Sequence, residues 1–381
     1  MDVTALVAGG LGLGRLEDGR VALIDGALPG ERVVMEVTED RRDMVRGHVT
    51  TVLAPSPDRV VPPCPHLHEG CGGCDLMHAS AAAQGALKRG IVMDALRRIG
   101  RLVHPPVATV VRSVPSEGYR TSLRVGVDDE GRPGMHRRRA WEIVPTPGCL
   151  VAHPAAQAAL AVTDRPPGDE LIVRASDLGG EVLVTEATRP RGVTVEEVHG
   201  RGFRVSAASF FQSGPQAAAL LVDVIDELLG SRLVAGGNLA DLYAGVGVLG
   251  ACLVDRHPGV RLIAVESHPS AVADLRRNLH DVAGSEIASV DVAGWRPSGP
   301  VDVVVADPAR PGLGKSAARA VGRACPAALV LVSCDPASLG RDVGLLQAEG
   351  YGLDTVQVLD LFPHTSHVEA VSLWIRQSQS T

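Results

Sequence analysis

A cluster of three cysteines is the first feature of the sequence that could carry chemistry. The stretch CPHLHEGCGGC occupies residues 64–74 and places Cys64, Cys71 and Cys74 close together in a chain that has seven cysteines. In a reducing compartment, clustered cysteines hold metal or take part in catalysis more often than they form disulfides. Thiolates suit both zinc and iron, and nearby histidines such as His66 favour zinc slightly. The spacing alone leaves zinc, an iron–sulfur cluster and thiol redox chemistry open.

A second candidate is Cys334, which follows the apolar run of ALVLVSCDPASLGRD (328–342). The run predicts a buried strand that ends at the cysteine, and the residues after it predict a helix. A cysteine just before a helix N-terminus can have a lowered thiol pKa and act as a nucleophile. The alternative is a small buried apolar residue, which is the usual role of a free cysteine and the one we expect for Cys252 and Cys325.

Three strand ends in the same half of the chain predict a cofactor site. DLYAGVGVLG (241–250) predicts a strand, a glycine turn that includes Gly245, and the start of a helix. The next predicted strand ends at Glu266, whose carboxylate could accept hydrogen bonds from both ribose hydroxyls of a nucleoside. VDVVVADPAR (301–310) ends in Asp307 and a proline. Because ligands bind at the carboxyl ends of parallel strands, these groups should converge on one crevice. Ordinary strand-end turns are the alternative.

The reaction follows from the groups that meet there. A dinucleotide site needs the full G-x-G-x-x-G pattern, whereas a short glycine turn with two acids fits S-adenosylmethionine better. Glu369, in FPHTSHVEA (362–370), places a carboxylate before the last predicted strand. A thiol, a carboxylate and a methyl donor fit the methylation of uracil. Cys334 would add to carbon 6, carbon 5 would attack the methyl group, and the carboxylate would remove the proton from carbon 5.

Three regions of the chain must position these groups. Residues 1–55 alternate apolar and polar residues between glycine turns, which predicts a small β-barrel of OB type. Residues 56–204 contain a proline-rich linker, the cysteine cluster, a helical stretch and a second strand-rich part that holds Cys149. Over residues 205–381, nearly continuous Val, Ile and Leu runs alternate with helical patterns, which predicts a doubly wound α/β sheet.

Together these motifs resemble the RNA uracil-5-methyltransferase family, whose members use S-adenosylmethionine to make 5-methyluridine in ribosomal or transfer RNA. The similar stretches of the catalytic half are SFFQSG, DLYAGVGVLG, AVESHPSAV, DPARPGLG, SCDPASLGRD and DLFPHTSHVEAVSLW. GLGLGRLEDGRVALIDGALPGE resembles the family's TRAM domain, an RNA-binding barrel, and CPHLHEGCGGC with TPGCLVAHP resembles its iron–sulfur segment. The resemblance implies a Rossmann-like methyltransferase domain that follows a TRAM barrel and a central iron–sulfur domain.

The resemblance also implies roles for individual residues. It makes Cys334 the nucleophile and Glu369 the base. Contacts with S-adenosylmethionine are implied for Gln212, Tyr243, Gly245, Glu266, Asp291 and Asp307. A [4Fe–4S] cluster would be held by Cys64, Cys71, Cys74 and Cys149. The cluster would brace the linker and the helix against the β-rich domain, because the methylation itself needs no electron.

Composition limits the partners and the location. No apolar run approaches the roughly 18–20 residues of a membrane span, and no signal peptide is recognisable. We therefore expect a cytoplasmic monomer with no membrane partner. The net charge of −7 argues weakly against a nucleic-acid partner. The basic run HRRRA (136–140), Arg120 and Arg124 could nevertheless contact RNA phosphates, and a solvated turn is the alternative for that run.

The target nucleotide is the least determined feature. Transfer RNA enzymes of this family often lack the barrel and the cluster, so we favour a uridine in 23S ribosomal RNA over one in transfer RNA or over another RNA base. Two other classes compete, a zinc-containing nucleic-acid-binding protein and an electron-transfer iron–sulfur protein. The first leaves Cys334 and Glu369 without a role, and the second needs a redox partner that no motif indicates.

Overall fold

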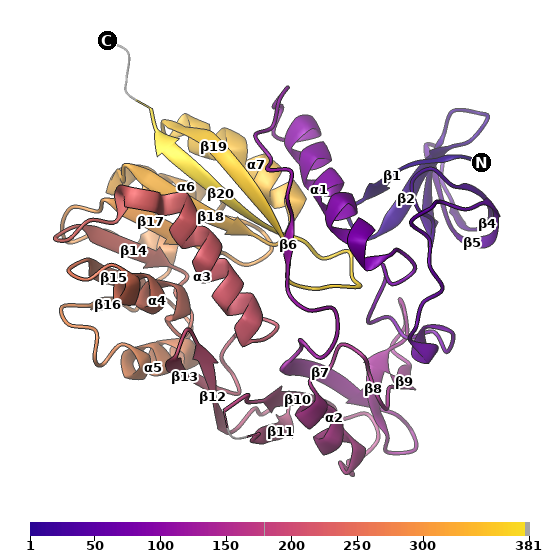
Figure 1. Cartoon of the computed structure of the whole chain (residues 1–381), viewed down its shortest axis with the longest axis horizontal. Coiled ribbons are helices and arrows are strands. Elements are labelled where there is room, and N and C mark those ends of the chain that lie inside the picture. Colours follow the sequence, from indigo (N-terminus) through magenta and orange to yellow (C-terminus); the bar gives the residue numbers. More distant parts are fainter. Residues whose placement is uncertain (179, 378–381) are drawn as a thin grey trace.

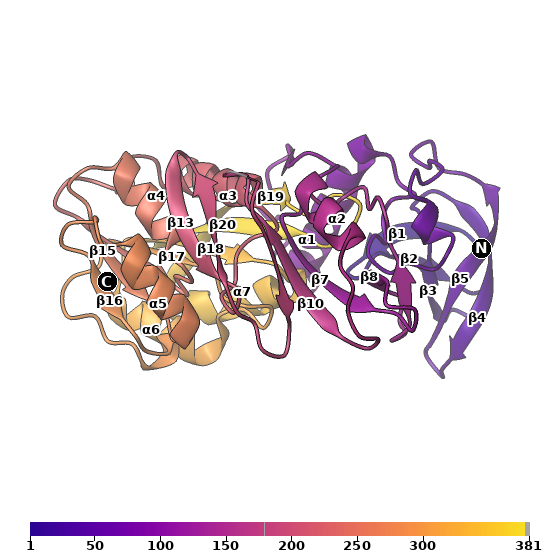
Figure 2. The same cartoon turned by 90° about the horizontal axis from the view of Figure 1, so that it is seen from below.

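The computed structural model describes residues 1–178 and 180–377 and has three parts (Figures 1 and 2). A small barrel lies at one end of the molecule and a large sheet at the other, with a central sheet between them on the lower side of Figure 1. In the described ranges, no helix is both long enough and apolar enough to cross a membrane.

The N-terminal part is a five-stranded sheet that curls toward closure. Its order is β1-β2-β3-β5-β4, and the strands are β1 (Val3–Val7), β2 (Leu11–Arg15), β3 (Val21–Asp25), β4 (Arg32–Asp40) and β5 (Met44–Ala54). Its edges meet where Asp2 pairs with Arg32, and small apolar side chains such as Ala22 and Val33 fill the interior. This is the small β-barrel that the alternating sequence predicts.

The central part is built on an antiparallel sheet of order β11-β10-β7-β8-β9. Its strands are β7 (Ser122–Val127), β8 (Pro133–His136), β9 (Ile143–Pro145), β10 (Glu170–Ala175) and β11 (Val182–Glu186). Helix α2 (Pro154–Ala161) packs on this sheet, where Leu123, Ala156 and Val173 share one buried cluster. A hairpin of β12 (Val193–Val198) and β13 (Arg201–Ser206) follows it in the chain.

The C-terminal part is an eight-stranded sheet of order β16-β15-β14-β17-β18-β20-β19-β6. Its strands are β6 (Arg112–Ser113), β14 (Asn238–Leu242), β15 (Arg261–Val265), β16 (Glu286–Ala288), β17 (Val303–Ala306), β18 (Ala328–Ser333), β19 (Tyr351–Asp360) and β20 (Glu369–Arg376). Neighbouring strands from β16 to β18 are parallel, whereas β20 runs antiparallel to both β18 and β19. The inner strands are buried on both faces, as parallel strands under helices are.

Helices cover both faces of this sheet. One face packs against α3 (Pro215–Leu229), α4 (Val248–Arg256) and α5 (Pro269–Asn278). The other face packs against α1 (Ala81–Arg98), α6 (Gly314–Ala324) and α7 (Pro336–Ala348). The strand order reverses beside β14, because the chain runs first to β15 and later returns as β17 on the other side. A crevice forms at the carboxyl ends of the strands at such a reversal. The predicted doubly wound α/β sheet is confirmed.

Helix α1 and strand β6 belong with the large sheet, although the predicted boundaries place them in the central region. Val92 and Leu96 of α1 share a buried cluster with Val343 of α7, and β6 extends the sheet beside β19. The periodicity of α1 indicates an apolar face, but it does not indicate which sheet covers that face.

A buried ion pair fixes α1 at the end of β19. The fully buried Lys88 donates from Nζ to the carboxylate of Asp360 and, at 3.0 Å, to the carbonyl of Phe362. Burial lowers the pKa of Lys88, and the Asp360 carboxylate opposes that shift. Since a buried charge is tolerated only with such partners, the pair determines where α1 sits on the sheet.

Removing one member of this pair should destabilise the protein. Lys88→Met leaves the Asp360 carboxylate buried without its cation, which typically costs about 3–5 kcal/mol of unfolding free energy. The double variant Lys88→Met/Asp360→Leu should lose less than the sum of the two single changes, as coupled sites do. The control is Lys315→Met, at the exposed second lysine of the chain, which should change stability by no more than about 0.5 kcal/mol. Urea unfolding measures all of these, and a Lys88→Met protein as stable as the control would contradict the role of the pair.

Candidate active site

A strained turn follows β14 at the crevice. Tyr243 has a φ of +62°, a conformation that residues other than glycine rarely adopt. Gly247, with a φ of +95°, comes just before α4. A Cβ on Gly247 would lie 2.7 Å from a methyl carbon of Leu275, so glycine is needed for α4 to begin this close to α5. Strained backbone of this kind concentrates at ligand sites.

Glu266, directly after β15, binds the same turn. Its Oε2 accepts a hydrogen bond from the N–H of Gly245 at 2.9 Å. Its Oε1 accepts from the N–H groups of Ser267 and His268, each at 2.7 Å. A carboxylate offers about four acceptor sites, so roughly one remains for a ligand hydroxyl. Glu266 therefore shapes the turn, whatever ligand contact it also makes.

The other predicted cofactor residues come together from distant parts of the chain. The Nε2 of Gln212, just before α3, donates to Oδ2 of Asp307, just after β17, at 3.2 Å. Burial raises the pKa of Asp307 to about 6, and the hydrogen bond from Gln212 opposes this. Burial, helped by the negative charge of nearby Asp291, raises the pKa of Tyr243 to about 12. The exposed Asp291 also caps the short helix η3 (Val292–Gly294) by accepting from the N–H of Ala293 at 2.8 Å.

Asp241 is a member of this site that the sequence reading missed. It lies within β14 and is 1% exposed. Burial, helped by the charges of Asp307 and Glu266 and opposed by a hydrogen bond from the N–H of Gly250, raises its pKa to about 7. Its Oδ1 has no hydrogen-bond partner in the part of the chain that the structure describes. The sequence does contain a signal for Asp241, because an aspartate within the apolar run of a predicted strand is unusual.

Cys334 and Glu369 stand opposite each other on neighbouring strands. Cys334 follows β18, Glu369 begins β20, and the antiparallel register pairs Ser333 with Ala370. The next pair in that register is Cys334 and Glu369. Glu369 is 4% exposed, and within the described ranges its Oε1 has no hydrogen-bond partner. Such a buried unpartnered oxygen calls for a functional explanation.

A pocket of about 200 Å³ opens beside Cys334. Its walls come from the β1–β2 turn of the barrel, from α1, and from segments next to β17, β18 and β20. The lining residues are Ala8, Gly9, Ile91, Arg310, Cys334, Asp335, Pro336, Ser366, His367 and Val368. The sequence reading missed Arg310 and His367, although DPAR and FPHTSHVE already placed them near Asp307 and Glu369.

Burial controls the protonation of the thiol and of the carboxyl group opposite it. Burial, helped by Glu369 and Asp307 and opposed by Arg310, raises the pKa of the Cys334 thiol to about 11. Burial and the charge of Asp307 raise the pKa of Glu369 well above its ordinary value. The helix N-terminus could have lowered this pKa, but burial and the two carboxyl groups outweigh the helix dipole.

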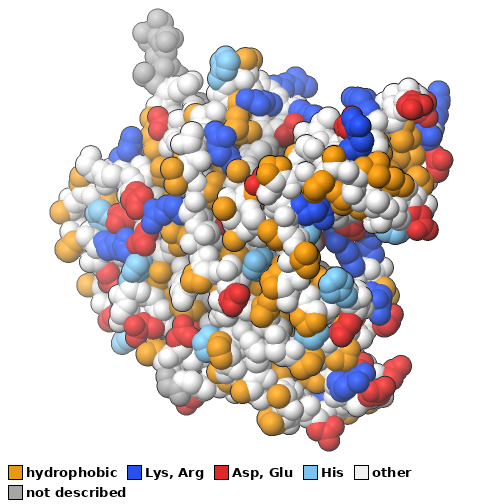
Figure 3. All heavy atoms as spheres, turned by 45° about the vertical axis from the view of Figure 1, so that its right-hand side comes forward, with side chains coloured by type: hydrophobic (Ala, Val, Ile, Leu, Met, Phe, Trp, Pro, Cys, Tyr) orange, Lys and Arg blue, Asp and Glu red, His pale blue; other side chains and the backbone are white. Residues whose placement is uncertain are grey.

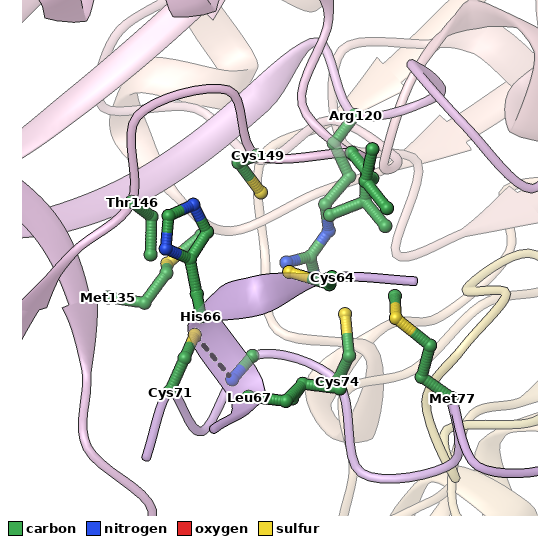
Figure 4. A pocket seen from close by; sticks show the side chains of 13 residues that line it. Cys64, His66, Leu67, Cys71, Cys74, Met77, Arg120, Met135, Thr146 and Cys149 are labelled. Atoms are coloured by element: carbon green, nitrogen blue, oxygen red, sulfur yellow. Dashed lines mark hydrogen bonds between the residues drawn. The ribbon is translucent and has the colours of Figure 1, made fainter. Parts of the chain in front are cut away.

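The four predicted cluster cysteines line one enclosed pocket (Figure 4). Cys64, Cys71 and Cys74 come from the linker before α1, and Cys149 comes from the segment between β9 and α2. The N–H of Gly73 donates to Sγ of Cys71 at 3.4 Å. Burial and the neighbouring cysteines raise the pKa of Cys74 to about 12. Four thiolates gathered here would need a compensating cation.

The histidines near this pocket do not complete a zinc site. The ring nitrogens of His66 are both engaged, one with the carbonyl of Pro147 at 2.8 Å and the other with Glu69 at 3.2 Å, and His68 is exposed. Over residues 1–178 and 180–377, no group of three or more His, Cys, Asp or Glu side chains is arranged to hold a single metal ion. The slight preference of the sequence for zinc has no support in this geometry.

Most of the arginines that we expected to contact RNA have partners within the protein. Four form ion pairs: Arg137 with Glu142, Arg138 and Arg139 with Asp25 of the barrel, and Arg124 with Glu170. Arg120 lines the cysteine pocket, with its guanidinium carbon 5.8 Å from the centre of the Phe362 ring. Basic and acidic side chains are interspersed on the face in Figure 3. The ion pair with Asp25 means that Arg138 links the central sheet to the barrel. RNA contact by these arginines stays a prediction.

Comparison with known proteins identifies the two outer parts and the family. The TRAM domain family matches residues 2–50, and the methyltransferase small domain family matches residues 212–320. An uncharacterized RNA methyltransferase of Streptomyces coelicolor is 32% identical over 98% of this chain and 92% of its own. Another, from Corynebacterium diphtheriae, is 30% identical over 97% of this chain and 94% of its own. The crystal structure of Pyrococcus abyssi tRNA (uracil-54, C5)-methyltransferase has the same fold, with a TM-score of 0.76 and 24% identity over 98% of this chain and 100% of that one.

The raised pKa of Cys334 predicts slow alkylation in the free protein. Modification by iodoacetamide should accelerate as the pH rises and should not level off below about pH 9, because the thiolate is the reactive form. Glu369→Gln removes one of the carboxyl groups that raise this pKa, so alkylation should become roughly threefold to tenfold faster at a given pH. Peptide mass spectrometry follows each cysteine, with the exposed Cys325 as internal reference. A plateau near neutral pH would contradict the raised pKa.

Proposed function

We propose that this chain, which belongs to the RNA methyltransferase family of its Streptomyces and Corynebacterium relatives, methylates carbon 5 of a uridine in RNA. Its fold and its matching domains make it an S-adenosylmethionine-dependent methyltransferase with an N-terminal TRAM domain. The observation that carries the finer proposal is that Cys334, which lines a pocket, lies close enough to the buried Glu369 and to Asp307 for both carboxyl groups to raise its pKa, next to the register that pairs Ser333 with Ala370. An adenine methyltransferase needs no such thiol, and cytosine enzymes typically hold theirs after a proline.

The proposed mechanism uses both groups in turn. The thiol of Cys334 releases its proton to solvent, and Sγ adds to carbon 6 of the uracil; the electron pair of the double bond between carbons 5 and 6 shifts to give an enolate whose carbon 5 is nucleophilic. S-adenosylmethionine supplies the methyl group that carbon 5 takes and leaves as S-adenosylhomocysteine. Glu369 then accepts the proton from carbon 5, and the bond between Sγ and carbon 6 breaks to give 5-methyluridine. Burial raises the pKa of Glu369, and a carboxylate with a raised pKa is a stronger proton acceptor.

The walls of the pocket beside Cys334 favour a substrate in which one nucleobase is unstacked from its neighbours. Its walls come from the barrel, from α1 and from three segments next to strands of the large sheet, so a nucleobase inside a helical stack could not reach the thiol. The target nucleotide would therefore be turned out of its stack before it reacts.

The target RNA stays a prediction. We favoured 23S ribosomal RNA because transfer RNA enzymes of the family often lack the barrel and the cluster. The fold of the Pyrococcus abyssi tRNA enzyme spans 98% of this chain, so full length does not separate the two kinds of target. A uridine in transfer RNA is therefore as strong an alternative.

We further propose that the cysteine pocket holds a [4Fe–4S] cluster. Four cysteines that line one pocket supply the ligand set that such clusters use. The N–H of Gly73 already points to a cysteine sulfur, as N–H groups do around these clusters. The cluster would brace the linker against the central sheet, since methyl transfer consumes no electrons.

Glu369→Gln should trap the covalent intermediate of the reaction. Without the carboxylate of Glu369 as proton acceptor, the methylated uracil cannot lose the proton from carbon 5, so the bond to Cys334 should persist. Denaturing electrophoresis with a labelled methyl donor should then show a protein–RNA adduct. The matched variant Cys334→Ala should form no adduct and show no turnover, while calorimetry should find its affinity for S-adenosylmethionine unchanged. Turnover by Cys334→Ala, or a Glu369→Gln protein without adduct, would count against the mechanism.

Iron and acid-labile sulfide should accompany the protein when it is purified without oxygen. We expect about four of each per chain and a brown colour. Cys149→Ser should lower the iron content, because it removes a ligand, while Cys325→Ser, at an exposed cysteine outside the pocket, should leave it unchanged. Stoichiometric zinc without iron would overturn the proposal.

A further inference from the structure

The loop of residues 361–368 leads directly to Glu369 and is held by parts of the chain that lie outside the large sheet. The N–H of His364 donates to Oε1 of Gln84 at 2.7 Å, and its carbonyl accepts from the N–H of Leu76 at 2.9 Å. The hydroxyl of Tyr119 donates to the carbonyl of Pro363 at 3.1 Å. The sheet thus fixes the two ends of the loop, and other segments fix its middle.

Asp75 makes the closest of these attachments. Its Oδ1 accepts from the N–H of Ser366 at 2.6 Å, and its Oδ2 accepts from the hydroxyl of the same residue at 2.6 Å. Ser366 lines the pocket beside Cys334 and stands three residues before Glu369. Asp75 immediately follows Cys74 of the cysteine pocket. Two short hydrogen bonds with an ionised acceptor are among the stronger contacts that a loop can receive.

The barrel closes over the same contact. Gly10 of the β1–β2 turn has a φ of +72°. A Cβ there would lie 2.8 Å from Oδ2 of Asp75 and 3.0 Å from Cβ of Ser366. Gly9, the preceding residue in this turn, lines the pocket. Asp75 therefore lies where the barrel, the cysteine-rich segment of residues 64–74 and the loop of residues 361–368 meet.

From these contacts we infer that Asp75 is a positioning residue, which holds the loop before Glu369 and so sets the geometry of the pocket for the target base. The inference rests on the proposed function and deepens it. Asp75 is the direct sequence neighbour of Cys74, so it links the cysteine pocket to Glu369, the proposed proton acceptor. Neither of its two bonds is to Cys334 or Glu369, so it acts on the reaction only through Ser366. A displacement of about 1 Å in a reacting group can cost roughly 10²-fold in rate, so a loosened loop should slow turnover.

The test compares Asp75→Ala with Ser366→Ala and with a control, Asp58→Ala, whose exposed carboxylate lies in the same linker. Hydrogen exchange of peptides that cover residues 361–369 is measured without RNA. Exchange should become at least about tenfold faster in Asp75→Ala, less so in Ser366→Ala, and should not change in Asp58→Ala. The kcat for methyl transfer should fall about tenfold to a hundredfold in Asp75→Ala, with little change in S-adenosylmethionine affinity. Asp75→Asn keeps the acceptor for the N–H of Ser366 and should restore part of both losses.

Three outcomes distinguish this inference from others. Wild-type exchange of the loop in Asp75→Ala would overturn it, and so would a loosened loop with unchanged kcat. Loss of iron from Asp75→Ala that matches the loss of activity would also overturn it, since Asp75 would then act on the cysteine pocket alone. Ser366→Ala leaves the cysteine-rich segment untouched and tests the same contact if Asp75→Ala folds poorly. A wild-type protein that makes no 5-methyluridine would refute the proposed function, whereas the exchange measurements would still report whether Asp75 holds the loop.

Discussion

Burial of the Lys88 ammonium group constrains how the parts of this protein fit together. The charge can be buried only where Asp360 and the carbonyl of Phe362 meet it, so α1 has to lie on the large sheet at the end of β19. This docking brings the cysteine-rich segment, which directly precedes α1, to the loop before Glu369. It also places Ile91 of α1 in one apolar cluster with Leu6 and Leu28 of the barrel region. The barrel, the cysteine pocket and the loop of residues 361–368 thus meet in one contact region.

The same contact region explains why the proposed active site is shared between parts of the chain. The large sheet supplies the thiol, the buried carboxyl group and the cofactor crevice, while the barrel and α1 supply the remaining walls of the pocket. Enclosure raises the pKa of Cys334 to about 11, so the free thiol is protonated at neutral pH. The reactive thiolate of Cys334 would form only when the target uracil fills the pocket and takes up the negative charge. This requirement limits the reaction of the thiol with other electrophiles.

The sequence predicted most of the large sheet and the edge at which its candidate site residues meet, because strand ends in a doubly wound sheet meet at one edge by rule. Gln212, Glu266 and Asp307 lie at that edge as expected. The facing of Cys334 and Glu369 could not be derived from local pattern, since it depends on the insertion of β20 between β18 and β19. The docking of α1 was missed for a similar reason, as was Asp75, whose partner Ser366 is nearly three hundred positions away. The helix N-terminus after Cys334 allowed a lowered thiol pKa, whereas burial, which depends on the whole fold, raises it.

The central claim is that the methyl group ends on carbon 5 of a uridine. Bulk ribosomal RNA and transfer RNA from a strain that lacks this protein can be incubated with the purified enzyme and S-adenosylmethionine carrying a labelled methyl group. Digestion to nucleosides and mass spectrometry then show which nucleoside carries the label, and the RNA pool that carries it identifies the class of target. The proposed mechanism should place the label in 5-methyluridine alone, and label in a methylated cytidine or adenosine would refute it.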